Sequence, residues 1–236
     1  MVAAWAAVCG ALVVAWGVTA VAQQVDAPAA GAAAEINAAF LDPDLDVAEW
    51  VTRFEGESRE VFTSRRAILA AMQVQPGEAA ADVGAGTGLY TALLAGAVGP
   101  RGWVYAVDIA PRFVAHIAER AAAAGLGNVT PVVCTAASVQ LPPECVDLVF
   151  ICDTYHHFEH PAQTLASIHA ALRPGGRLAV VDFERIEGVS REWVLDHVRA
   201  GKGEVTAEIE SAGFRLTAEP RVPGLEENYM LIFTKE

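Results

Sequence analysis

A short apolar segment that runs into three closely spaced glycines constrains the fold of this chain most strongly. Residues 79–83 are apolar apart from one acid, Asp82, and Gly84, Gly86 and Gly88 follow at alternate positions. Glycines at such a junction let the backbone turn sharply and let a ligand approach the main chain. A helical pattern begins directly after them. The stretch therefore predicts a strand, a ligand-binding loop and a helix in succession.

Strand and helix patterns alternate along the rest of the chain. The segment 146–151 is apolar almost throughout, as expected of a strand buried on both faces. Strands are expected over 79–83, 103–107, 129–133, 146–151, 177–182, 214–218 and 229–234, and helices over 47–72 (two, broken near Gly56), 89–98, 111–124, 161–172 and 204–212. This alternation predicts an α/β fold, an open, doubly wound, mostly parallel sheet with helices on both faces. Ligands in such sheets bind beyond the carboxyl ends of the strands.

Net charge narrows the choice of partners. The 236 residues include 16 Lys and Arg against 29 Asp and Glu, a formal net charge of −13. An acidic chain without a basic cluster lacks the electrostatic footprint of a nucleic-acid-binding protein. We therefore expect a small-molecule partner and no nucleic acid.

The amino-terminal composition predicts an appendage before the folded domain. Residues 1–22 carry no charged side chain and end in a small-x-small pattern, Ala20-Val21-Ala22, typical of a cleaved signal peptide. The run is also long enough for an uncleaved membrane anchor. One feature argues against export: no Lys or Arg precedes the run. A mis-assigned start is the third alternative. We expect an exported, periplasmic or membrane-anchored protein, with a cytoplasmic protein as the alternative. After this segment we expect a linker over 23–45 and one domain over 46–236, whose first part, 46–75, forms lid helices.

The spacing of the loop separates two classes of nucleotide ligand. A dinucleotide fingerprint requires G-x-G-x-x-G, whereas this loop reads G-x-G-x-G, so a nicotinamide oxidoreductase is disfavoured. Asp82 would repel a pyrophosphate but hold an ammonium group. Asp108 follows Gly88 by 20 residues at the end of the next predicted strand, where an acid accepts both hydroxyls of a ribose. S-adenosylmethionine has a ribose and an amino-acid end without a phosphate.

Residues 82–88 resemble the first motif of class I S-adenosylmethionine-dependent methyltransferases, in particular those with a type 11-like methyltransferase domain. Residues 146–153 and the Leu-Arg-Pro-Gly-Gly turn within 172–178 are similar to later motifs of that family. The resemblance implies a Rossmann-like sheet of seven strands, the last antiparallel, which agrees with the count above. It also implies S-adenosylmethionine as cofactor, bound by Asp82, Gly84, Ala85, Gly86, Gly88, Asp108, Ile109, Thr135 and Asp153.

One stretch departs from the family pattern. The family usually has an acid after the third strand that contacts the adenine amine, whereas here the sequence is Cys134-Thr135-Ala136-Ala137. Thr135 can accept a hydrogen bond, and the two alanines offer only backbone. The leading hypothesis is methyl transfer to a small-molecule acceptor. The alternative is an exported protein that binds a ligand or partner on the same fold without turnover.

The segment after the fourth predicted strand carries the candidate catalytic residues. His156 and His157 are suited by their ordinary pKa to act as a base or to orient the acceptor. One of them could instead pack beneath the loop. Asp153, His156, His157 and His160 have the side-chain types of a metal site, but adjacent histidines on a short loop rarely point at one ion, so we predict no metal. Asp153 is expected to close the cofactor pocket.

The expected lid helices mix charged and aromatic side chains. Arg59 or Arg65 could bind the carboxylate of the cofactor, since guanidinium suits bidentate carboxylate binding. The alternative is a solvated helix face with pairs such as Glu55 to Arg59.

Overall fold

The computed structural model describes residues 1, 34, 35 and 37–236. The predicted signal or anchor over 1–22 and most of the predicted linker lie outside the described residues. Within the described part of the chain, no helix combines the length and the apolar character needed to span a bilayer.

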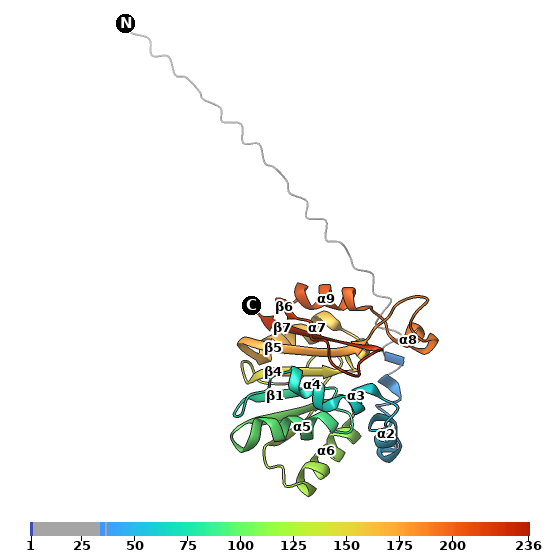
Figure 1. Ribbon diagram of the computed structural model, residues 1–236. Coiled ribbons are helices and arrows are strands. Elements are labelled where there is room, and N and C mark those ends of the chain that lie inside the picture. Colours follow the sequence, from blue (N-terminus) through green and yellow to red (C-terminus); the bar gives the residue numbers. More distant parts are fainter. Residues whose placement is uncertain (2–33, 36) are drawn as a thin grey trace.

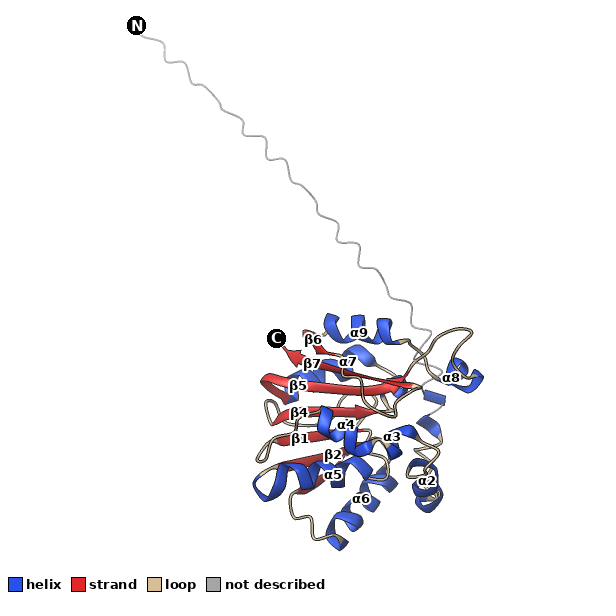
Figure 2. Ribbon diagram, in the orientation of Figure 1, coloured by secondary structure: helices blue, strands red, loops and turns tan. Residues whose placement is uncertain are grey.

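Seven strands form one sheet in the order β3-β2-β1-β4-β5-β7-β6. All neighbours pair in parallel except β7, which is antiparallel to both β5 and β6 and points the opposite way in Figure 2. The bounds are β1 Ala79–Val83, β2 Trp103–Asp108, β3 Val129–Val133, β4 Val146–Cys152, β5 Leu172–Phe183, β6 Phe214–Ala218 and β7 Asn228–Lys235. The predicted fold class, a doubly wound seven-stranded sheet with its last strand antiparallel, is confirmed.

Helices cover both faces of the sheet (Figure 1). Their buried apolar residues form a hydrophobic core on each face. Alternate residues of β1 separate the two cores: Ala80 packs in the core that contains α4 and α5, and Ala81 in the core that contains α7 and α9. Ile117 of α6 packs against Ala106 of β2, on the side of α5. The bounds are α4 Arg65–Ala71, α5 Leu89–Val98, α6 Pro111–Ala123, α7 Pro161–Ala171 and α9 Lys202–Ser211, with a 3-10 turn η1 over Gly99–Arg101.

Three short helices gather at the edge of the sheet where β1, β4 and β5 end (Figure 1). They are α2 (Val47–Phe54), α3 (Glu60–Thr63) and α8 (Glu192–His197), and a 3-10 turn, η2 (Tyr155–His157), follows β4 at the same edge. Two helices were expected over 47–72, but this stretch forms three, α2, α3 and α4. Helix α8 was not expected from the sequence. This edge is where the fold places ligands.

The predicted linker needs a correction at its carboxyl end. Leu45 is buried, and Phe40 packs with Trp50, Phe54 and Phe113. The Ala, Pro and Asp around these two apolar residues suggested a solvated segment, but burial of Phe40 and Leu45 fixes this part of the chain on the domain. The folded part thus begins before residue 46.

Candidate active site

The glycine loop between β1 and α5 packs its backbone closely against neighbouring elements. Gly84 has a φ of 74°, and a Cβ added there would lie 2.2 Å from Cγ2 of Thr154. The amides of Gly84 and Ala85 donate to the carbonyl of Val107, at 2.8 and 3.1 Å. Gly88 donates to the carbonyl of Ala85 at 2.8 Å. These N–H groups are used within the fold, so the loop offers a close-approach surface rather than a nest of donors for phosphate.

Asp108 closes the loop from the end of β2. Its Oδ2 accepts from the amide of Gly86 at 2.7 Å, and its Oδ1 accepts from the amide of Ala110 at 2.8 Å. Burial raises the pKa of this carboxyl to about 6, and the backbone N–H groups of Ala110, Gly86 and Ile109 oppose the rise. The carboxyl is therefore mostly ionised at neutral pH. Ile109 follows Asp108 and also lines the cavity.

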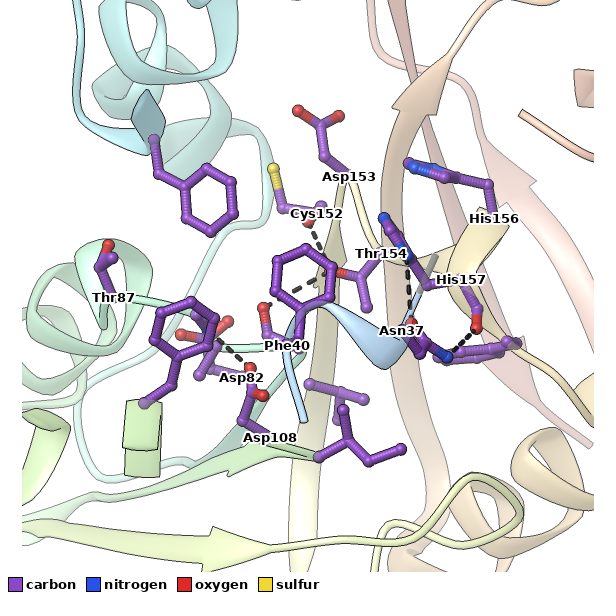
Figure 3. A pocket seen from close by; sticks show the side chains of 18 of the residues that line it. Asn37, Phe40, Asp82, Thr87, Asp108, Cys152, Asp153, Thr154, His156 and His157 are labelled. Atoms are coloured by element: carbon purple, nitrogen blue, oxygen red, sulfur yellow. Dashed lines mark hydrogen bonds between the residues drawn. The ribbon is translucent and has the colours of Figure 1, made fainter. Parts of the chain in front are cut away.

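Asp82 is a second buried acid in the same cavity (Figure 3). It accepts from the hydroxyl of Thr91 at 2.7 Å. Burial is the main cause that raises its pKa to about 7, the Thr91 hydrogen bond opposes the rise, and the nearby Asp108 adds to it. Two carboxylates thus face the loop from adjacent strands, which suits a ligand with an ammonium group and a ribose.

Asp153 lies beyond the end of β4 and binds the lid segment. It forms an ion pair with Arg59, which precedes α3, and accepts from Nδ2 of Asn228 at 2.6 Å. Burial raises the pKa of Asp153, and the Arg59 guanidinium opposes that rise. Arg59 lines the cavity, whereas Arg65 donates to the carbonyl of Phe62 at 2.6 Å. Of the two arginines expected near the cofactor, Arg59 is the one the structure brings to the cavity.

A second contact joins the lid to the glycine loop. Glu55, at the carboxyl end of α2, forms an ion pair with Arg120 and accepts from the hydroxyl of Thr87 at 2.8 Å. The expected Glu55 to Arg59 pair is therefore replaced by contacts to the body of the domain.

Thr135 lines the cavity but uses its hydroxyl locally. The oxygen accepts from the amide of Ala137 at 3.4 Å and lies 3.5 Å from the carbonyl of Ser138. Adenine recognition at this wall would therefore involve main-chain groups and the apolar faces of residues such as Ala136.

The two candidate catalytic histidines lie at the end of the cavity away from Asp82 and Asp108 (Figure 3). His156 is buried, and its Nδ1 lies 2.7 Å from Oδ1 of Asp182 at the end of β5. Nδ1 of His157 lies 3.2 Å from Oδ1 of Asn37. Burial, together with His156, lowers the pKa of His157 to about 2, so this ring is neutral at physiological pH.

Several cavity residues were not identified from the sequence. Asn37 and Phe40 come from the predicted linker, and Phe183 from the end of β5. His197 and Trp193 come from α8, and their rings stack with centroids 4.7 Å apart. Behind the cavity, the buried acid Asp182 contacts His156. It is the last residue of a predicted strand and thus carried a sequence signal, because acids at strand ends on this edge are site candidates.

Eight of the nine predicted cofactor residues line one cavity of about 550 Å³. The exception is Gly88, which caps the start of α5, where an added Cβ would lie 3.0 Å from Cγ1 of Ile117. Asp82, Asp108, Ile109, Thr135 and Asp153 lie on its walls. A cavity of this size fits a cofactor-sized ligand with a small second molecule.

The sheet order, the glycine loop and the acid at the end of β2 define a Rossmann-like methyltransferase fold. Residues 81–180 match the sequence model of a family described as a methyltransferase domain. The ubiquinone/menaquinone biosynthesis C-methyltransferase UbiE of Burkholderia multivorans is 31% identical over 119 residues, which are 50% of this chain and 48% of that protein. The chain thus spans about half the length of the curated relatives it matches.

Solved structures give the same fold over a longer stretch. A SAM-dependent methyltransferase from Aquifex aeolicus superposes with a TM-score of 0.71 at 25% identity and covers 81% of this chain and 99% of that one. An S-adenosylmethionine-dependent methyltransferase from Mesorhizobium loti has a TM-score of 0.56 at 16% identity, over 75% of this chain and 98% of that one, and shows the fold alone. Together the comparisons support S-adenosylmethionine as the cofactor.

The residues present fit this cofactor. The loop amides are already bonded within the fold, so nothing calls for a phosphate. The buried Asp108 is placed to accept from a ribose, and Asp82 supplies a second carboxylate for an ammonium group. The glycine at position 84 is required by the contact with Thr154, which keeps this side of the cavity compact.

Proposed function

We propose that this chain transfers the methyl group of S-adenosylmethionine to a small-molecule acceptor. One observation carries the proposal: a single cavity joins the buried acids beside the glycine loop to the paired histidines after β4. The first end matches a cofactor with a ribose and an ammonium group, and the second offers polar contacts to an acceptor.

When bound, the cofactor supplies an electrophilic methyl group on a sulfonium. The residues of the chain bind and align the two reactants, which is the main source of acceleration for such a displacement. In this proposal Asp108 accepts from the ribose hydroxyls and Asp82 from the ammonium group. Gly84, Ala85 and Gly86 provide the surface against which the cofactor lies.

The acceptor end favours an aromatic or otherwise apolar small molecule that carries an ionisable group. Phe40, Phe158, Phe183 and Trp193 line this part of the cavity, and His156 and His157 lie among them. UbiE is named as a C-methyltransferase of ubiquinone and menaquinone biosynthesis. By this likeness we propose a hydroxylated aromatic ring as the acceptor class, with His156 and His157 contacting its polar group.

Calorimetric titration of S-adenosylmethionine and S-adenosylhomocysteine into the full chain tests the cofactor assignment. Micromolar binding, about 8 kcal/mol, is expected. Asp108→Asn should weaken it about 30- to 160-fold, because a charged acceptor of hydrogen bonds contributes about 2–3 kcal/mol. Asp147→Asn is the matched control, since Asp147 also accepts from a backbone amide, that of Ala79, but at the other end of β1. Equal binding by both variants would contradict the placement of the cofactor.

The alternative of ligand binding without turnover is favoured by one observation. The hydroxyl of Thr135 is used within its own turn, so the usual acidic contact to adenine has no replacement from this side chain. Cofactor binding without methyl transfer to any of a series of hydroxylated aromatic compounds would favour the alternative over the enzyme.

The location of the protein is proposed from the sequence of residues 1–22, which lie outside the described residues. Their uncharged composition and the Ala20-Val21-Ala22 pattern support an export signal or a membrane anchor. Amino-terminal sequencing of the protein from its host, after cell fractionation, distinguishes them. A mature chain that starts at Gln23 supports cleavage, an intact chain in the membrane fraction supports an anchor, and an intact soluble chain refutes both.

A further inference from the structure

Three imidazole rings converge at the acceptor end of the cavity. His156 and His157 come from η2, and His197 is the last residue of α8. One ring nitrogen from each lies within 4.8 Å of those from the other two. The ring centroid of His197 lies 5.2 Å from that of His156 and 5.3 Å from that of His157. The centroids of His156 and His157 are 4.3 Å apart. The tight turn of η2 therefore directs two neighbouring histidines to the same side.

Hydrogen bonds orient two of these rings by one nitrogen and leave the other nitrogen available. Nδ1 of His156 lies against the carboxylate of Asp182, and Nδ1 of His157 against the amide oxygen of Asn37. Within the described part of the chain, no hydrogen bond is formed by Nε2 of either ring. A carboxylate or amide oxygen behind a histidine is the arrangement that fixes the tautomer and orientation of metal-bound imidazole.

The surroundings also suit a cation. Asp182 is a buried acid directly behind the cluster, and it accepts from the amides of His156 and Phe183 as well as from the ring. His197 is positioned by stacking on Trp193. Nitrogen ligands about 2.0–2.1 Å from a tetrahedral zinc ion lie about 3.3 Å apart, so modest side-chain rotations would close the cluster around an ion.

We propose that His156, His157 and His197 bind one divalent transition-metal cation of the zinc type, with a fourth position open to the cavity. Three histidines with an open position form the ligand set of catalytic rather than structural zinc. The occupant of the open position rests on the proposed function: it is the hydroxyl oxygen of the acceptor, and a bound cation lowers the pKa of that hydroxyl. The two histidines after β4 are then ligands, and no histidine base is required.

Metal binding is measured directly on the full chain, without a polyhistidine tag and after treatment with a chelator. Zn²⁺ is titrated by calorimetry and Co²⁺ by its visible absorption, and one equivalent of each is expected to bind. His197→Gln should weaken Zn²⁺ binding at least 100-fold and abolish the absorption of tetrahedral Co²⁺. His160→Gln is the control, because His160 is exposed, on the loop after η2, and outside the cluster. If His197→Gln does not fold by circular dichroism, His157→Gln replaces it.

Two results overturn the metal site: no Zn²⁺ binding by the folded chain, or equal binding by the control and the cluster variants. Titration of S-adenosylhomocysteine into the same samples separates this outcome from failure of the proposed function. Cofactor binding without Zn²⁺ binding refutes the metal site and leaves methyl transfer. Zn²⁺ binding that depends on His197, without cofactor binding, refutes methyl transfer and leaves the metal site.

Discussion

Asp82 should destabilise the protein in the absence of ligand, because its charge is buried and no cation among the described residues pairs with it. Its carboxyl accepts from the hydroxyl of Thr91 and lies near a second acid, Asp108. Burial raises its pKa from 3.8 to about 7. Between these two pKa values the folded state binds more protons than the unfolded state. The free energy of unfolding therefore falls as pH rises from about 4 to about 7 and is level above that range.

The size of this effect follows from the two pKa values. Ionisation of Asp82 costs the fold about 4 kcal/mol at pH 8 and about 2 kcal/mol at pH 5. Asp82→Asn removes this dependence while its side-chain oxygen can still accept from Thr91. A buried amide NH2 without a partner costs about 1–3 kcal/mol, but that cost is the same at both pH values. The stability of the variant relative to the wild type should therefore increase by about 2–3 kcal/mol from pH 5 to pH 8.

Urea denaturation of both proteins at a series of pH values between 5 and 8 measures this difference. Asp44→Asn controls for the loss of one carboxylate at an exposed site. The Asp82 variant should also bind S-adenosylmethionine more weakly. The carboxylate at this position would then lower the stability of the fold and raise its affinity for the cofactor. A difference between variant and wild type that does not change with pH would refute the reasoning, because the charge of Asp82 would then not be the source of the cost.

Two further substitutions test the loop and the lid. Gly84→Ala should lower stability by about 3 kcal/mol, measured as a lower Tm, because it combines a positive φ of 74° with a Cβ 2.2 Å from Thr154. Arg59→Gln should lower the free energy of unfolding at pH 8, measured by urea denaturation, by about 2–3 kcal/mol. The substitution leaves the buried carboxylate of Asp153 without its ion pair.

Each of these has a control with the same change of residue type. Gly77 has a φ of 93° but nothing within 4 Å of an added Cβ, so Gly77→Ala should cost only the backbone strain. Equal losses at positions 77 and 84 would show that the contact with Thr154 is unimportant. Arg65 lies over the ring of Phe62 and forms no ion pair within the described residues, so Arg65→Gln should cost less than Arg59→Gln. The reverse order would contradict the role given to the Arg59–Asp153 pair.

Two of the elements that were predicted with correct bounds have ends marked by residues that cannot continue them. The strand 79–83 ends at Gly84, and the helix 89–98 ends at Gly99-Pro100. The same rule misplaced the start of β5. Pro174-Gly175-Gly176 suggested a turn before the strand, but Leu172 already pairs with Val146 across a register shift, so the turn lies within the strand. Pairing with a neighbouring strand overrode the local signal.

The residues of the candidate site fall into two groups: those that local sequence could predict and those that come from distant parts of the chain. The acids and glycines beside β1 and β2 could be predicted because a single strand–loop–helix unit places them. Asn37 could not, because it is 120 residues from the histidine it contacts and lies in a segment of linker-like composition. His197 comes from a helix of six residues, too short for its apolar period to stand out. Chain topology alone brings these side chains to the cavity.

The lid segment between α2 and α3 is attached to the domain on both sides of the glycine loop. Glu55 bonds to Thr87 and pairs with Arg120 on one side, and Arg59 pairs with Asp153 on the other. Between them, the ring of Phe54 lies 3.4 Å from the position of a Cβ on Gly86. A ligand that lies on this loop is therefore covered by a segment that these contacts already hold in place. Because the carboxylates of Asp82 and Asp108 beneath this segment are buried, a bound ammonium group would offset the cost of their burial.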